Sequence, residues 1–144
     1  MSSTHTLRGE CHCGAIHATL VASRPADALQ VRACQCGFCA RHGAITVSDP
    51  NGHATFTVRE GQLQAYQFAT RTGTSLICQT CGVYVGVMLK DGDDVWSVMN
   101  VRGLAVTELL GRIAEPVSYD NETAEQRITR RKAKWTPTDI RLSR

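Results

Sequence analysis

The amino-acid sequence predicts an all-β (β-rich) fold. Short segments rich in β-branched and aromatic residues recur along the chain. Clusters of Asp, Asn, Gly and Pro separate several of them, and these residues tolerate the backbone conformations of tight turns. The length of 144 residues and a composition that is 42% hydrophobic and 20% charged are typical of an ordinary globular domain. We therefore expect residues 1–144 to form a single domain.

The strands can be placed by following this pattern along the chain. Turn residues at 49–52, 60–61 and 91–94 mark boundaries between neighbouring strands. The expected strands are Ala15–Val21, Ala44–Val47, Ala54–Val58, Leu63–Phe68, Ser75–Ile77, Val83–Leu89 and Val95–Val101.

Two helical segments are expected after the last of these strands. Leu104–Leu110 can form a short helical turn, and Glu122–Trp135 has Asn121 as an N-cap, acidic residues early and basic residues late. The basic residues are Arg127, Arg130, Arg131, Lys132 and Lys134. We expect this cluster to be the solvated end of the helix, where positive charge suits the helix dipole, and not an anion- or nucleic-acid-binding surface.

The N-terminal segment Met1–Glu10 is polar and lacks the apolar stretch of a signal peptide. The sequence also lacks an apolar run long enough to cross a bilayer. We therefore expect a cytoplasmic protein with no membrane partner. In that reducing compartment disulfides are rare, so cysteines at close spacings are expected to be metal ligands or catalytic thiols.

The seven cysteines fall into three clusters. Cys78 and Cys81 have the CxxC spacing that forms half of a zinc site. Cys11 and Cys13 are two residues apart, so in an extended segment their side chains would point to the same side. Together the two pairs predict a closed, structural site of four thiolates that joins the N-terminal segment to the middle of the chain.

The remaining three cysteines, Cys34, Cys36 and Cys39, are close enough in sequence to bind one further ion. Three protein ligands and an open position are typical of a catalytic zinc. We therefore expect two zinc ions per chain. The formal net charge is +3, and zinc bound by thiolates would bring it close to zero. Nucleic acid is consequently not an expected partner.

Other interpretations of the three-cysteine cluster remain open from spacing alone. His42, three residues after Cys39, could complete a second structural site. Cys36 and Cys39 match the spacing of redox thiols, although the βαβ setting of thioredoxin-like motifs is missing. Buried, inert cysteines are a third interpretation, but burial does not explain the spacings.

Three motifs of the sequence resemble one known family. They are Gly9-Glu10-Cys11-His12-Cys13-Gly14-Ala15-Ile16, then Cys34-Gln35-Cys36-Gly37-Phe38-Cys39 with Arg41-His42-Gly43-Ala44, then Cys78-Gln79-Thr80-Cys81-Gly82-Val83. In order and spacing they resemble the glutathione-dependent formaldehyde-activating enzymes, a family that includes the centromere protein V-like proteins. The resemblance runs from about residue 9 to about residue 101.

The resemblance implies an Mss4-like fold, in which zinc holds small antiparallel sheets together. It implies a structural zinc on Cys11, Cys13, Cys78 and Cys81, and a catalytic zinc on Cys34, Cys36 and Cys39. The implied activity is that of a carbon-sulfur lyase similar to S-(hydroxymethyl)glutathione synthase, with glutathione as co-substrate and formaldehyde as the aldehyde. Residues 104–144 carry no motif that matches the family.

The expected function is therefore zinc-dependent chemistry on an adduct of a small thiol and an aldehyde. His42 is the nearest candidate for a proton donor, and Arg41 is a candidate anchor for a carboxylate of the thiol. A non-catalytic zinc module that binds protein or nucleic acid through residues 127–134 is the main alternative. A zinc-storage or metal-sensing protein is a further one.

Overall fold

The computed structural model describes residues 5–144, so the start of the polar segment Met1–Glu10 lies outside the described residues. The chain is rich in strands, as predicted. The strands are β1 (His5–Glu10), β2 (Ile16–Ala22), β3 (Val31–Cys34), β4 (Thr46–Val47), β5 (His53–Arg59), β6 (Leu63–Tyr66), β7 (Thr74–Cys78), β8 (Tyr84–Asp91), β9 (Asp94–Asn100), β10 (Glu115–Val117) and β11 (Thr136–Ser143). The helices are α1 (Gly37–His42), α2 (Val101–Leu104) and α3 (Ala124–Lys134), with a short 3₁₀ helix at Ala26–Ala28.

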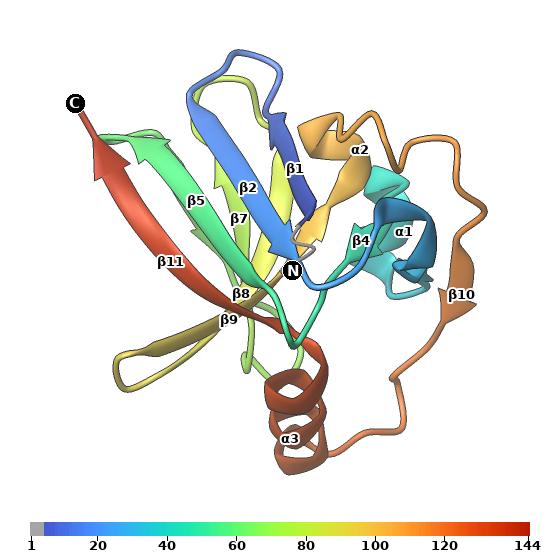
Figure 1. Ribbon diagram of the computed structural model, residues 1–144. Coiled ribbons are helices and arrows are strands. Elements are labelled where there is room, and N and C mark those ends of the chain that lie inside the picture. Colours follow the sequence, from blue (N-terminus) through green and yellow to red (C-terminus); the bar gives the residue numbers. More distant parts are fainter. Residues whose placement is uncertain (1–4) are drawn as a thin grey trace.

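The strands form one branched sheet (Figure 1). Its main path runs in the order β1-β2-β5-β11-β9-β4-β3-β10, and β9 also pairs with β8, which continues to β7 and β6. β11 connects the two parts because Thr136 and Pro137 pair with β9, while Thr138–Ser143 pair with β5. The long last strand therefore holds the N-terminal strands against the rest of the sheet.

Two strand pairs differ from the antiparallel sheets that we expected. β10 runs parallel to β3, and β11 runs parallel to β5, so the sheet is mixed. Parallel neighbours cannot be joined by a tight turn and need a long connection. Residues 60–135, which include α3, lie between β5 and β11 and provide such a connection.

The predicted helix boundaries need correction. Where a helical turn was expected at Leu104–Leu110, the structure has α2, which starts three residues earlier and ends at Leu104. Its C-cap, Ala105, has a left-handed backbone with φ of 52°. The C-terminal helix exists, but its N-cap is Thr123 and not Asn121. The Thr123 hydroxyl accepts from Gln126 N at 3.1 Å, and the Gln126 side chain accepts from Thr123 N at 2.9 Å, which is a capping box.

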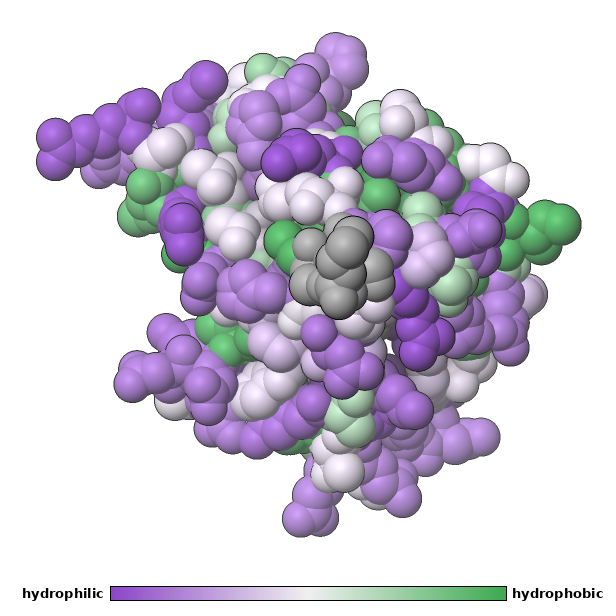
Figure 2. All heavy atoms as spheres, in the orientation of Figure 1, coloured by the Kyte–Doolittle hydropathy of each residue, from purple (hydrophilic) through white to green (hydrophobic). Residues whose placement is uncertain are grey.

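The largest buried cluster lies between β2, β5 and the strands β7 to β9. Phe56, Ile16 and Val85 have no exposed surface, and Cys11 and Cys78 belong to the same cluster. A smaller cluster contains Cys39 and Tyr84, with Cys34, Cys36 and Phe38 packed against it. On the face shown in Figure 2, hydrophilic residues predominate and hydrophobic ones appear in small separate areas. The two groups of cysteines thus lie in different hydrophobic clusters.

Candidate functional site

Four cysteines come together where two turns meet. Cys11 and Cys13 lie in the turn between β1 and β2, and Cys78 and Cys81 lie at the turn between β7 and β8. The sulfurs of Cys11 and Cys13 are 3.8 Å apart, those of Cys13 and Cys78 are 3.5 Å apart, and all four lie within 4.8 Å of one another. Tetrahedral zinc with Zn–S bonds of about 2.3 Å places its sulfurs about 3.8 Å apart. The four-cysteine group therefore fits zinc.

Both turns use the same local geometry, which differs from the extended Cys11–Cys13 segment that we expected. Gly14 has φ of 82° and Gly82 has φ of 76°, and each donates its N–H to the carbonyl of the first cysteine of its pair. Backbone N–H groups also point at the sulfurs, with Ile16 N 3.3 Å from Cys11 Sγ and Cys81 N 3.5 Å from Cys78 Sγ. These donors stabilise negative charge on sulfur.

Other backbone N–H groups explain the acidity of one thiol in the four-cysteine group. Burial alone would raise the pKa of Cys81, but hydrogen bonds from the backbone of Val83 and Cys13 outweigh it and lower the pKa to about 6. Burial raises the pKa of Cys78 to about 12. A cation would favour the ionised form of both.

The other three cysteines form a second group around the start of α1. Cys34 ends β3, Cys36 is the N-cap of α1, and Cys39 lies within the helix. Their sulfurs also lie within 4.8 Å of one another. Cys36 Sγ accepts from Cys39 N at 3.4 Å. Within residues 5–144, no His, Cys, Asp or Glu side chain joins this group as a fourth ligand, and this includes His42.

Three sulfurs this close cannot all ionise without a cation, because their negative charges repel. Hydrogen bonds from Cys34 and then Cys39 lower the pKa of Cys36 to about 2. The bond to Cys36 raises the pKa of Cys34, and bonds with Cys34 and then Cys36 raise the pKa of Cys39. Without a cation, the group therefore favours one thiolate, on Cys36, beside two protonated thiols. A metal ion could replace both protons, so this donor set also fits zinc.

Tyr84 is a polar neighbour of the three-cysteine group that the sequence analysis did not identify. Its hydroxyl lies 3.9 Å from Cys39 Sγ, and the residue is almost completely buried. Burial, followed by the charge of Cys39, raises the pKa of Tyr84 well above its ordinary value. The hydroxyl therefore stays protonated and can donate to the sulfur. Only the position of Tyr84 three residues after Cys81, at the start of a strand, could have suggested this role.

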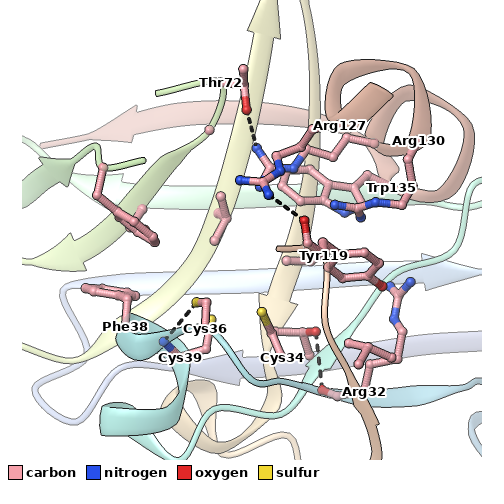
Figure 3. A pocket seen from close by; sticks show the side chains of 18 of the residues that line it. Arg32, Cys34, Cys36, Phe38, Cys39, Thr72, Tyr119, Arg127, Arg130 and Trp135 are labelled. Carbon is pink, nitrogen blue, oxygen red and sulfur yellow. Dashed lines mark hydrogen bonds between the residues drawn. The ribbon is translucent and has the colours of Figure 1, made fainter. Parts of the chain in front are cut away.

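The three-cysteine group lies at one wall of a cavity. This cavity, together with the open solvent at its mouth, encloses about 730 Å³. Figure 3 shows Cys34, Cys36, Cys39 and Phe38 on one side and side chains of α3 on the other, with Tyr119 between them. The cavity thus gives solvent access to the three-cysteine group on one side and to the side chains of α3 on the other.

The wall opposite the cysteines is made by the basic cluster of α3. The cavity is lined by Arg127, Arg130 and Arg131, whose side chains are partly buried. The prediction that the whole cluster is the solvated end of a helix is therefore wrong for these three arginines. It failed because Trp135 and Ile128 pack this helix against β9 and its neighbours, which turns one charged face inward. Lys132 lies outside the cavity and pairs with Asp91.

The loop between β6 and β7 forms part of the rim. Phe68, Thr70, Thr72 and Gly73 line the cavity. Ala69 and Arg71, in the same loop, have positive φ angles of 53° and 55°, which are unfavourable for residues with a side chain. The Phe68 ring lies 5.3 Å from that of Phe38. The loop therefore brings an aromatic side chain to the mouth of the cavity at a cost in backbone strain.

The two residues that the sequence suggested as substrate contacts lie elsewhere. His42 is exposed, with its ring 4.7 Å from that of Phe38, and Arg41 donates to Gly37 O at 2.9 Å. Both line a neighbouring shallow hollow with Gln64 and Tyr66, and neither lines the cavity that holds the three cysteines.

Comparisons with known proteins agree with this cysteine arrangement. A family model described as "Glutathione-dependent formaldehyde-activating enzyme" matches residues 6–110, which include all seven cysteines and end before α3. The crystal structure of a Rhodobacter sphaeroides protein is similar, with a TM-score of 0.58 and 28% sequence identity, over 76% of this chain and 99% of that chain. No curated protein matches the chain. Across residues 5–144, no helix combines the length and the apolar character needed to span a bilayer.

Proposed function

Because the chain belongs to the glutathione-dependent formaldehyde-activating enzyme family, we propose that it is a zinc-dependent carbon-sulfur lyase that acts on a thiol-aldehyde adduct. The reaction would resemble that of S-(hydroxymethyl)glutathione synthase, in a reducing compartment such as the cytoplasm. One observation carries the proposal. The three-cysteine group faces a cavity, and no fourth protein ligand joins it within the described part of the chain.

Two sets of residues would hold zinc. Cys11, Cys13, Cys78 and Cys81 would hold a structural ion, since four sulfurs complete a tetrahedron and leave no position for a substrate. Cys34, Cys36 and Cys39 would hold the second ion and leave one position open. An ion bound there supplies one piece of chemistry, which is to lower the pKa of a thiol that binds beside the three cysteines.

The residues around the open site have separate roles. The Tyr84 hydroxyl lies 3.9 Å from Cys39 Sγ, and by donating to an ionised Cys39 it would hold that sulfur in place and favour its ionised form. Phe38 and Phe68 line the cavity with apolar surface, which would restrict water around a bound substrate. The arginines of α3 provide positive charge at the far wall, where an acidic part of a substrate can bind.

The reaction is balanced without a redox partner. In the forward direction the sulfur of the thiol adds to the carbonyl carbon of formaldehyde, one S–C bond forms, and the C=O bond becomes a C–O single bond. The proton lost from sulfur ends on that oxygen. The reverse reaction breaks the S–C bond and returns the proton to sulfur, which is the lyase direction.

The structure weakens the alternative of a nucleic-acid-binding or protein-binding zinc module. That alternative used residues 127–134 as an exposed basic surface, but Arg127, Arg130 and Arg131 line the cavity and Lys132 pairs with Asp91. His42 and Arg41 line a neighbouring hollow, and their roles as proton donor and carboxylate anchor stay predictions.

The test combines metal analysis with a direct measurement of the reaction. We expect two zinc ions per chain and faster exchange between glutathione and S-(hydroxymethyl)glutathione, measured by NMR exchange spectroscopy against the uncatalysed rate. The Cys36→Ser variant should lose the acceleration and retain the circular dichroism spectrum of the wild type. A folded wild-type protein with two zinc ions that accelerates exchange for no thiol-aldehyde pair would rule out the proposal.

A further inference from the structure

We propose that the α3 wall of the cavity is a carboxylate-binding site, built around Arg131, that selects thiols carrying a carboxylate away from the sulfur. This inference rests on the proposed function, since it names the class of thiol that would act at the same site. The site lies on residues beyond the family match, which ends at residue 110.

The α3 wall has more positive than negative charge. Arg130 donates to both oxygens of Glu122, at 2.7 and 3.0 Å, and Arg127 Nε lies 3.4 Å from the same carboxylate. Among residues 5–144, Arg131 forms no ion pair. The one carboxylate thus pairs with two of the three guanidinium groups, and the excess positive charge lines the cavity. Electrostatic attraction for an anion is stronger there than at an open surface.

Arg131 is held in place before any ligand binds. Its Nη1 donates to Thr72 Oγ1 at 3.0 Å, an interaction drawn in Figure 3, and its guanidinium lies 4.6 Å from the centre of the Trp135 ring. Gly73 leaves room for the same group, because a Cβ atom at Gly73 would lie 2.6 Å from Nη1. A guanidinium fixed on three sides loses little side-chain entropy when it binds a ligand.

The fixed guanidinium has an unused donor. Arg131 Nε is buried, and no acceptor within the described residues bonds to it. A buried donor without a partner is costly, and natural structures contain few of them. Since Thr72 uses Nη1, the edge formed by Nε and Nη2 is left, and this is an edge that a carboxylate can bind with two parallel hydrogen bonds. Burial lowers the pKa of Arg131 to about 10, so the group is still charged at neutral pH.

The cysteines and Arg131 line the same cavity. In Figure 3, Arg127 and Arg130 of the same helix lie across the cavity from the cysteines. A ligand that reaches both sides would therefore carry sulfur at one end and a carboxylate at the other. Glutathione belongs to this class, whereas small neutral thiols do not. Residues of the C-terminal segment would thus determine the specificity for the thiol, and residues of the segment that matches the family would carry out the reaction.

Direct binding tests this assignment without turnover. S-methylglutathione has both carboxylates and no thiol, and its diethyl ester has neither carboxylate. Calorimetry should show that the wild type prefers the acid, and that Arg131→Gln reduces this preference by about 10- to 100-fold, as expected for loss of hydrogen bonds between charged groups. Lys132→Gln removes the same charge from the same helix outside the cavity and should retain the preference.

Two further variants separate binding from folding. Arg131→Lys keeps the charge but loses the planar fork, so it should have an intermediate preference. Gly73→Ala keeps Arg131 and displaces its guanidinium, so it should also reduce the preference. Equal binding of acid and ester by the wild type would overturn the inference. An Arg131→Gln variant that keeps the preference for the acid would also overturn it. So would an Arg131→Gln variant whose affinities for acid and ester fall by the same factor and which loses metal from Cys34, Cys36 and Cys39, because Arg131 would then only support the cysteines.

The outcome is distinguishable from failure of the proposed function. If the proposed lyase reaction is absent but the carboxylate site exists, S-methylglutathione still binds in an Arg131-dependent way. If the reaction exists but the carboxylate site does not, exchange is accelerated equally for glutathione and for its diethyl ester.

Discussion

The two cysteine groups use the same ligand atom in opposite ways. The four-cysteine group joins two turns that are far apart in sequence, since Cys13 and Cys78, whose sulfurs are 3.5 Å apart, are separated by 65 positions. Two members of this group, Cys11 and Cys78, lie in the main hydrophobic core. The three-cysteine group lies entirely between positions 34 and 39, beside a cavity. Both groups use cysteine sulfur, so the ligand type does not distinguish a structural site from a reactive one. The distinction lies in how far apart the ligands are in sequence and in whether they have access to a cavity.

The physical reason lies partly in the unfolded chain. A cross-link that closes a long loop removes more conformational entropy from the unfolded state than one that closes a short loop. The four-cysteine group closes a long loop, whereas the three-cysteine group closes almost none. Metal binding at the four-cysteine group should therefore contribute far more to the stability of the fold.

The largest expected effect is on stability, in the Cys78→Ser variant. Cys78 has no exposed surface and lies in the main core, and its loss leaves an incomplete ligand set across the two turns. We expect the free energy of unfolding to fall by more than about 4 kcal/mol, since the binding energy of a structural zinc is folding energy. Urea denaturation followed by circular dichroism measures it.

The matched variant is Cys36→Ser, which makes the same chemical change in the other group. It should lower the free energy of unfolding by less than about 1.5 kcal/mol, because Cys36 is half-exposed at a helix N-cap where Ser is a good substitute. Similar losses of stability in both variants would contradict the distinction between the two groups.

A smaller effect is expected for Tyr84→Phe, which removes the hydroxyl beside Cys39. Groups that hydrogen-bond to metal ligands typically change metal affinity by about 10- to 100-fold when they are removed. Competition with a chromophoric chelator should show weaker zinc binding at Cys34, Cys36 and Cys39, with unchanged binding at the four-cysteine group. Tyr66→Phe removes the hydroxyl of an exposed tyrosine in the neighbouring hollow and should change neither affinity. Equal weakening of both sites by Tyr84→Phe would indicate a general structural role for this tyrosine.

The smallest expected effect is on stability and concerns Glu122, which pairs with arginines of the α3 wall. This wall lies beside the three-cysteine group and has no counterpart at the four-cysteine group. The hydrogen bond from Arg130 lowers the pKa of Glu122. A carboxylate with a lowered folded-state pKa stabilises the fold above its unfolded pKa, and this contribution is lost as the pH falls through the folded pKa. The free energy of unfolding of the wild type should exceed that of Glu122→Gln by about 1 kcal/mol at pH 7.

This difference in unfolding free energy should shrink as the pH falls below about 4.5, the region in which an ordinary glutamate takes up its proton. Glu122 is not one of the candidate metal ligands, so loss of metal in acid should affect both proteins alike and the difference should report Glu122. Glu125→Gln, an exposed neighbour on α3 with no ion pair in the described chain, serves as the control. A pH-independent gap between wild type and Glu122→Gln would show that the ion pair with Arg130 is not its source.

Several elements could be predicted from the sequence because their signals are local. Segments such as β5 and β8 combine β-branched residues with turn residues at their ends. β11 could not be found in this way, because it contains Pro137 and Asp139 and owes its place to long-range pairing with β5 and β9. β1 was missed for a related reason, since Leu7 is the only residue in it that is buried.

The candidate site likewise has parts with local sequence signals, which could be predicted, and parts that depend on long-range packing, which could not. Close spacing indicated the two cysteine pairs and the three-cysteine cluster, since a zinc site restricts the distances between its ligands. Spacing could not show that the two pairs, 65 residues apart, share one site. The inward position of Arg127, Arg130 and Arg131 could not be predicted, because the cavity exists only after α3 packs beside β9. Tyr84 was missed because a tyrosine at the start of a strand usually belongs to the core.

The central claim is that one cysteine group is closed and the other is open to a thiol. Zinc K-edge anomalous diffraction on crystals grown with S-methylglutathione and then with glutathione tests it most directly. We expect two zinc peaks, one with four cysteine sulfurs at the β1–β2 and β7–β8 turns, and one at Cys34, Cys36 and Cys39 that gains the glutathione sulfur as its fourth ligand. A single zinc, or a second zinc with His42 or another protein side chain as its fourth ligand in the presence of glutathione, would contradict the account.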